Sequence, residues 1–144
     1  MLRNRAYAEI KGGNETPSIR GNVRFHQRVD GVLVVVTLSG LPTDSKTGFF
    51  GLHIHEGGFC DGDDFSQTGA HLNNAKMPHP LHEGDLPPLM SYSGKAYMAV
   101  ITDRFMINDI VGKTLVIHSD RDDFTTQPSG NAGTKIACGE IRMA

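Results

Sequence analysis

The sequence has no apolar run approaching the roughly 18 residues of a membrane-spanning helix, so no membrane span is expected. It also has little excess charge, with a formal net charge of −2 at pH 7. Because nucleic acids and anionic membranes favour basic partners, neither is implied by this balance. Internal repeats, linker-like stretches and helices of normal length are missing from the pattern as well. The 144 residues are therefore expected to form a single domain, residues 1–144, with a sizeable core.

Cysteine is scarce, and the two that are present, Cys60 and Cys138, do not form a C-x-x-C motif. They can be two free buried thiols or one disulfide, and a thiol titration under denaturing, non-reducing conditions separates these alternatives. The first residues, 1–7, lack the apolar segment of a signal peptide. The protein is therefore expected in the cytoplasm as written, or outside it if a leader has been removed.

Short strand-like segments dominate what is present. The strongest is 32–38, which is rich in β-branched residues, and Asp30-Gly31 before it is typical of a hairpin turn. A connection is expected over 107–113 and a polar loop over 119–134. Further strands are expected over 5–11, 19–28, 49–55, 95–102, 114–118 and 135–142. Seven or eight short strands separated by turn signals predict an all-β fold, either a sandwich or a barrel.

Histidine is concentrated in one stretch, because five of the seven lie within residues 51–85 and His118 follows later. A neutral imidazole is the commonest protein ligand for transition metals. His53 and His55 alternate with apolar residues in the strand predicted over 49–55. Both side chains then leave the same face, about 6.6 Å apart. Their apolar neighbours face a core, so the metal is expected on the outer face of that sheet, covered by loops.

A second group of candidate ligands lies in a segment punctuated by glycine and proline, which indicates a loop. Its members are His71, His79, His82 and Asp85. Three imidazoles and one carboxylate can complete a tetrahedral shell, and the oxygen donor favours zinc. A closed site of this kind is usually structural. The nitrogen-only group on the strand suits copper better.

These segments resemble the signature blocks of the copper,zinc superoxide dismutase family and follow the order found in that family. The matching blocks are GLHIHE (51–56), GAHLN (69–73), HEGDL (82–86), GKTLVIH (112–118) and GNAGTKIACG (130–139). The resemblance implies an eight-stranded antiparallel Greek-key β-barrel or sandwich with long metal-binding and channel loops. It also implies an enzyme that converts superoxide, a small anionic substrate, into dioxygen and hydrogen peroxide by alternately reducing and oxidising copper.

Carried over position by position, the resemblance implies two cofactors, a copper ion and a zinc ion. The copper ligands would be His53, His55, His71 and His118. The zinc ligands would be His71, His79, His82 and Asp85, so that His71 bridges both metals and takes part in catalysis. Asp122 would link His53 to His79 behind the metals, and Cys60 and Cys138 would form a disulfide. His26 is expected to be an ordinary histidine.

Lys135 is the departure from the family that matters most. The family usually places arginine here, beside the copper, where it attracts and orients the anionic substrate. Lysine keeps the charge but loses the planar fork, so we expect Lys135 to act in catalysis at a modestly reduced rate. The segment between His79 and His82 is also short for the family. Because many relatives are dimers, the resemblance makes a homodimer possible, although no patch in the sequence identifies an interface.

Three other functions compete with the dismutase. A non-catalytic copper- and zinc-binding module for storage or delivery would keep the same ligands but show little turnover. A zinc hydrolase would use His53-x-His55, but the Asp-His pair that usually follows is replaced by Glu56-Gly57. An adhesive sandwich domain with incidental histidines does not explain the spacing of the ligands.

Overall fold

Antiparallel β-strands make up most of the protein in this computed structural model, which describes residues 4–144. The strands are β1 (Arg5–Gly12), β2 (Arg20–Arg28), β3 (Gly31–Ser39), β4 (Phe49–Phe50), β5 (Leu52–His55), β6 (Leu89–Met90), β7 (Ala96–Thr102), β8 (Thr114–His118), β9 (Lys135–Glu140) and β10 (Arg142–Met143). Within the described residues, helical structure is limited to the 3₁₀ turn η1 (Ser66–Thr68) and the short helix α1 (Ile107–Ile110). None of these helices is long and apolar enough to cross a membrane.

Successive side chains of each strand point to opposite faces of the sheet, so every second residue of β1, of β3 and of the middle of β2 is buried. In β3, Val32, Val34 and Val36 are completely buried, and in β2 the same is true of Val23 and Phe25. β-Branched and aromatic side chains fill a pleated surface well, which explains why these segments form strands. Their inward side chains meet those of β5 and β8 in one large apolar cluster. The predicted all-β class is confirmed, and the apolar neighbours of His53 and His55, Leu52 and Ile54, face the core as expected.

The strands of residues 4–144 form an eight-stranded sheet curled into a half-barrel, in the order β5-β8-β9-β1-β2-β3-β7 with β10 on β1. The neighbours β3 and β7, like β5 and β8, are not consecutive in the chain, so the connections cross over the barrel ends as in a Greek key. The small β4–β6 pair lies between the two free edges, because β4 runs into β5 and β6 leads into β7.

Two segments differ in detail from the sequence prediction. The strand predicted over 49–55 divides at Gly51, because β4 pairs with β6 whereas β5 pairs with β8. The connection predicted over 107–113 contains α1, whose Ile107 and Ile110 point into the core. The backbone N–H of Met106 donates to Asp109 at the start of this helix, over 2.8 Å. A single turn is too short to be visible as a helical period in the sequence.

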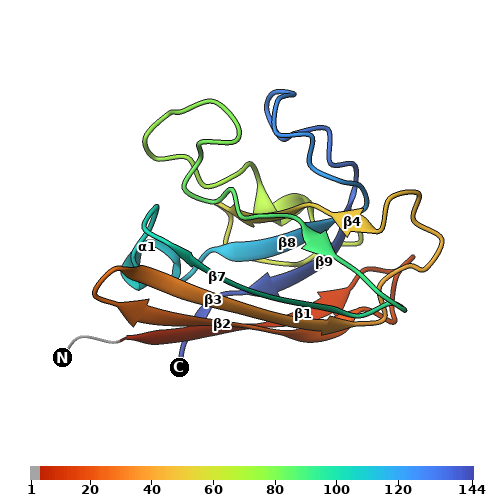
Figure 1. Cartoon of the computed structure of the whole chain (residues 1–144), viewed down its shortest axis with the longest axis horizontal. Coiled ribbons are helices and arrows are strands. Elements are labelled where there is room, and N and C mark those ends of the chain that lie inside the picture. Colours follow the sequence, from red (N-terminus) through yellow and green to blue (C-terminus); the bar gives the residue numbers. More distant parts are fainter. Residues whose placement is uncertain (1–3) are drawn as a thin grey trace.

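The connections are arranged asymmetrically around the barrel. Figure 1 shows the long loops between β5 and β7 and between β8 and β9 standing together above β8, on the side away from β1, β2 and β3. One side of the molecule is therefore loop and the other is the open outer face of the sheet.

Candidate metal centre

Strands β5 and β8 place three of the candidate imidazoles side by side. In β5 the side chains of Leu52 and Ile54 are completely buried in the barrel core, so the alternation turns His53 and His55 to the outer face. There the loops bury them, leaving 0% and 2% of their surfaces exposed. On the neighbouring strand, the N–H of His118 donates to the carbonyl of Gly51, immediately before β5.

The loop after β5 is attached to the free edge of that strand. The N–H of Leu72 donates to the carbonyl of Ile54, and that of Leu86 to the carbonyl of Leu52. Both leucines are buried against the core cluster. Isolated bridge pairings also join His55 to His71 and His53 to Asp85. The apolar residues beside the ligands therefore hold the loop on β5, and the polar side chains between them converge over the sheet.

The first group of converging side chains consists of imidazoles. His53, His55, His71 and His118 each offer one nitrogen, and these atoms lie within 4.8 Å of one another. Nε2 of His55 and Nε2 of His118 are 3.3 Å apart. Nδ1 of His53 and Nε2 of His71 are buried without a hydrogen-bond partner in the described residues. Buried nitrogens without partners are costly in a protein, so this donor set fits a soft or borderline metal ion such as copper.

The second group surrounds the carboxylate of Asp85. Nδ1 of His71 lies 2.9 Å from Oδ1, and Nδ1 of His79 lies 3.1 Å from Oδ2. Nδ1 of His82 is 3.2 Å from Oδ2 and 3.2 Å from Nδ1 of His71. Tetrahedral bonds of about 2.0–2.1 Å to zinc place neighbouring ligand atoms about 3.3 Å apart. The spacing of these four side chains therefore fits zinc. His53 also approaches this group, but its Nε2 is bound to Asp122.

His71 belongs to both groups through its two ring nitrogens. Nδ1 faces Asp85 and His82, whereas Nε2 has no partner among the described residues. The centre of its ring lies 4.0 Å from that of His53 and 4.9 Å from that of His55. One imidazole thus stands between the two sets of donors.

Comparison with known proteins agrees with this geometry. The family described as copper/zinc superoxide dismutase (SODC) matches residues 19–141. The chain belongs to the copper/zinc superoxide dismutase family. It is 33% identical to superoxide dismutase [Cu-Zn] 1 of Aquifex aeolicus, over 85% of this chain and 79% of that protein. It is 32% identical to superoxide dismutase [Cu-Zn] of Caulobacter vibrioides, over 95% and 85% respectively, and 32% identical to superoxide dismutase [Cu-Zn] 3 of Arabidopsis thaliana, over 96% and 90%.

In this member of the copper/zinc superoxide dismutase family, the carboxylate of Asp122 connects the two groups of ligands, because it contacts one imidazole of each. Oδ2 accepts a hydrogen bond from Nε2 of His53 over 2.7 Å, and Oδ1 accepts one from Nε2 of His79 over 2.8 Å. These bonds leave Nδ1 of each imidazole to face the converging ligands. Gly130 makes the contact possible, since a Cβ there would lie 2.0 Å from Oδ1 of Asp122, and its φ of +75° suits glycine.

Electrostatics keep the dismutase ligands in the form that binds metal. Burial lowers the pKa of His55 to about 2 and that of His118 to about 3, so both rings are neutral near pH 7. Burial alone would raise the pKa of Asp122, but hydrogen bonds from His53 and His79 outweigh it and lower this pKa to about 2. The centre thus combines neutral imidazoles with an ionised carboxylate behind them.

We expect the metal-free protein to lose stability as the pH falls below 6.5. Only the unfolded chain binds protons at His55 and His118 between pH 6.5 and about 3, because the folded pKa values are far lower. The free energy of unfolding should therefore drop by about 2 kcal/mol for each of them between pH 6.5 and 5. Urea unfolding of chelator-treated protein at several pH values measures this drop. In a His118→Asn variant the free energy of unfolding should fall less between pH 6.5 and 5 than in the wild type. An equal fall would contradict the lowered pKa of His118.

Cys60 and Cys138 form the disulfide that the family resemblance implied. Together with Phe65 and Val116 they make a small apolar cluster outside the main core. The N–H of Cys60 also donates to the side chain of Glu140. The bond ties the beginning of the metal loop to β9, and the alternative of two free thiols is wrong.

Lys135, where the family usually has arginine, stands beside the first group of ligands. Its Nζ donates to Oγ1 of Thr68 over 2.6 Å and to the carbonyl of Gly69 over 3.1 Å. Partial burial lowers the pKa of this ammonium group. With His55, His71 and His118, Lys135 lines a cavity of about 500 Å³. The cationic nitrogen is therefore held in the wall of the same cavity as these imidazoles.

Arg104, in the turn after β7, is a site residue that the sequence gave no reason to select. Its Nη1 lies 2.6 Å from the carbonyl oxygen of Pro80 and 3.3 Å from that of His82. A third carbonyl, that of Asp85, is 3.4 Å away. One guanidinium thus fastens the backbone that carries two of the candidate zinc ligands. Nothing in the local pattern around Arg104 indicates this contact, because its partners lie about twenty residues away.

Replacing Arg104 by lysine should weaken zinc binding by roughly tenfold, because the lysine side chain is one bond shorter and its ammonium group would not reach all three carbonyls that Nη1 contacts. Competition with a chromogenic chelator measures the affinity directly, without relying on activity. Arg28→Lys is the matched control, since Arg28 pairs with Asp30 in a hairpin away from the centre. If Arg104→Lys binds zinc as tightly as the control does, the guanidinium does not position the loop.

Proposed function

We propose that the two groups of converging side chains are the copper and zinc sites of a superoxide dismutase. Copper would be held by His53, His55, His71 and His118. Zinc would be held by His71, His79, His82 and Asp85. The observation that carries the proposal is the position of His71, whose two ring nitrogens face the two donor sets. An isolated metal site would not need a shared ring.

The reaction consumes two superoxide anions and two protons and yields one dioxygen and one hydrogen peroxide. Bound copper supplies the alternating one-electron oxidation and reduction, whereas zinc has no redox chemistry and supplies charge and order. The protein must attract the anion and deliver protons. His71 can hold a proton at Nε2, the nitrogen without a partner in the described residues. Lys135 supplies a positive charge at the same cavity, and Asp122 keeps His53 and His79 in fixed orientations.

The role of Lys135 can be tested by substitution. Lys135→Met should lower kcat/KM for superoxide by roughly tenfold at low ionic strength, and the loss should shrink as salt screens the charge. Lys135→Arg should leave the rate equal or raise it. Lys113→Met removes the same charge outside the cavity and serves as the control. A marked fall in Lys135→Arg would contradict the role, because that variant restores the residue usual in the family.

The experiment that tests the function combines metal content with turnover. Protein loaded with copper and zinc should contain one of each by elemental analysis, show a copper EPR signal, and consume superoxide catalytically. A storage or delivery module remains the competing function, favoured by lysine at position 135. That module would bind both metals with little turnover, so bound copper without dismutation would decide in its favour.

We also propose that residues 1–144 act as one domain and that two copies form a homodimer. Support for the dimer comes from the β4–β6 pair, where Phe49 and Met90 are register partners and both are exposed. Tyr92 beside them is 66% exposed. Light scattering coupled to size-exclusion chromatography measures the mass in solution. The value should be twice that of the chain, and Met90→Lys should shift it to the monomer.

A further inference from the structure

The outer face of the sheet carries a concentration of basic side chains, although the whole chain has a net charge of −2. In β1 and β2 the side chains of Ala6 and Val23 point into the core, so the residues next to them in each strand point outward. Five exposed cations gather on this face and are called the cationic band: Arg5, Lys11, Arg20, Arg24 and Lys95. A whole-chain sum of charges cannot reveal such a concentration.

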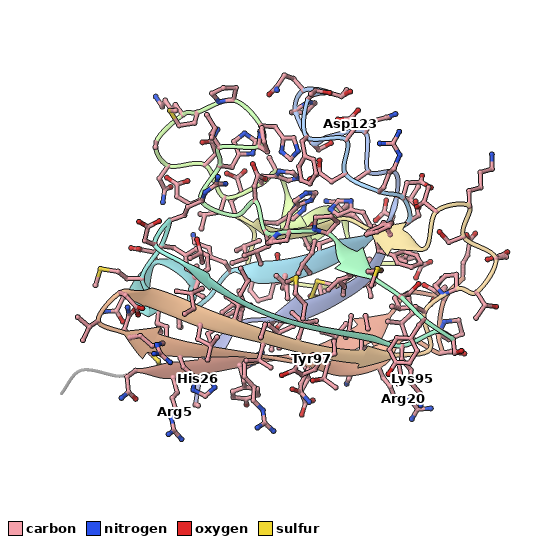
Figure 2. The ribbon with its side chains drawn as sticks, in the orientation of Figure 1. Arg5, Arg20, His26, Lys95, Tyr97 and Asp123 are labelled. Atoms are coloured by element: carbon pink, nitrogen blue, oxygen red, sulfur yellow. A yellow bond between two sulfur atoms is a disulfide. The ribbon has the colours of Figure 1, made fainter. Side chains whose placement is uncertain are left out.

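Figure 2 shows where the band lies relative to the metal loops. Arg5, Arg20 and Lys95 project from the outer face of the sheet, on the opposite side of the molecule from Asp123 in the loop after β8. His26 and Tyr97 project from the same face. The band is therefore separated from the metal centre by the thickness of the barrel, and the dismutase chemistry does not use it.

The register of the strands gives the layout of the band. Lys11 pairs with Arg20 at one end, and Arg5 pairs with His26 at the other. Lys11 is six positions after Arg5, which corresponds to about 20 Å along the strand. Arg24 lies between the two ends, opposite Tyr7. The charges of β1 and β2 thus form a strip about 20 Å long and only two strands wide.

The cations of this strip make no ion pair within the part of the chain described. Ion pairs within residues 4–144 near this face involve Arg28 with Asp30 and Arg142 with Glu140, and none involves the five cations of the band. Glu9 is a carboxylate on the same face, but it makes no ion pair within the part of the chain described. Like charges held close together repel one another, so an external anion would stabilise this arrangement.

The strip also contains a concave site. A cavity of about 380 Å³ is lined by Arg5, Ala6, Tyr7, Glu9, Asn22, Arg24, His26 and Ala144, so the Glu9 carboxylate shares it with two guanidinium groups. Two guanidinium groups, a phenol and an amide can donate hydrogen bonds to one sulfate or carboxylate group there. Arg20 follows about 13 Å further along β2, where it can meet the next anionic group of a chain.

We propose that the four cations of the band that lie on β1 and β2, namely Arg5, Lys11, Arg20 and Arg24, bind a linear anionic polysaccharide along these two strands. A narrow strip matches a chain with regularly spaced charges, whereas an anionic membrane would match charges spread over the whole face. The part of the face formed by β3 presents Leu33, Val35 and Thr37 instead. Single-stranded nucleic acid usually needs several aromatic platforms for its bases, and Tyr7 is the aromatic side chain within the strip.

The probe for this proposal is dextran sulfate, with neutral dextran as the reference. The copper,zinc-loaded protein should bind dextran sulfate, and the affinity should fall roughly 100-fold between 50 and 200 mM salt if about four charges are engaged. Lys11→Ser combined with Arg20→Ser and Arg24→Ser should reduce the affinity at least tenfold. Lys46→Ser combined with Lys76→Ser and Lys113→Ser removes the same charge elsewhere and should change the affinity less than twofold.

Several results would overturn the proposal. Equal binding of dextran sulfate and neutral dextran would show that charge is not recognised. An equal loss of affinity in the two triple variants would show that binding depends on net charge alone and not on the position of the charges. Tighter binding to poly-dT or to vesicles containing anionic lipid would assign the band to a different class of partner. Because all six substituted residues are surface lysines and arginines, circular dichroism and metal content should stay unchanged in both variants.

Discussion

Replacing His71 by alanine is expected to lower superoxide dismutation by at least about 100-fold. The imidazole lies between the two donor sets, with Nδ1 at 2.9 Å from Asp85 and Nε2 buried without a partner in the described residues. Its loss would remove one ligand from each metal and the group placed to transfer a proton, and positioned proton transfer alone contributes 10²–10⁴-fold in enzymes. The measurement is the rate of superoxide consumption per bound copper.

Two further variants show whether the bridge itself is responsible. His55→Ala should weaken copper binding but leave zinc affinity nearly unchanged, because His55 belongs to the first group alone. His71→Ala should weaken both. His26→Ala, which removes an imidazole from the far face of the barrel, should alter neither activity nor metal content. Dismutation by His71→Ala at more than a tenth of the original rate would contradict the proposed bridge.

Loss of the Cys60–Cys138 disulfide should lower the free energy of unfolding by several kcal/mol. The bond closes a segment with a sequence separation of 78 residues. The chain-entropy account gives about 4–5 kcal/mol for a loop of this length, as an upper value. That is a large share of the stability of a typical domain. Urea unfolding of the metal-free Cys60→Ser, Cys138→Ser double variant measures the change in the free energy of unfolding.

The reduced wild-type protein is the natural comparison for that variant. Treatment with a thiol reductant should bring its free energy of unfolding close to that of the double variant, because both lack the same constraint. A difference of less than about 1 kcal/mol between oxidised and reduced protein would contradict the prediction. The weaker attachment of the loop to β9 should also lower zinc affinity, which chelator competition would detect.

The strands could be predicted because β-branched content, alternation and turn signals are local properties of the sequence. His53 and His55 followed from the same alternation. The meeting of these two with His118 could not be derived from spacing, since it depends on the crossover that sets β5 beside β8. For that step the resemblance to the family was necessary.

Other features could not be predicted from the sequence, and each has a physical reason. Arg104 acts on backbone carbonyls, which have no sequence signature, and its partners belong to another segment. The division of the strand at Gly51 depends on which neighbours flank each half. The cationic band arises only when β1, β2 and the start of β7 lie in register, so that separated residues share one face.

The opposite placement of the band and the loops has a consequence for where the enzyme could work. A molecule tethered through the band would hold the loop between β8 and β9, which helps to form the opening lined by His118 and Lys135, away from its support. Superoxide would then reach the opening from the solution, while the face formed by β1 and β2 covered the bound polymer. Binding to the polysaccharide would therefore leave turnover unaffected. In a layer of molecules bound in this way, every metal centre would lie on the side that faces the solution.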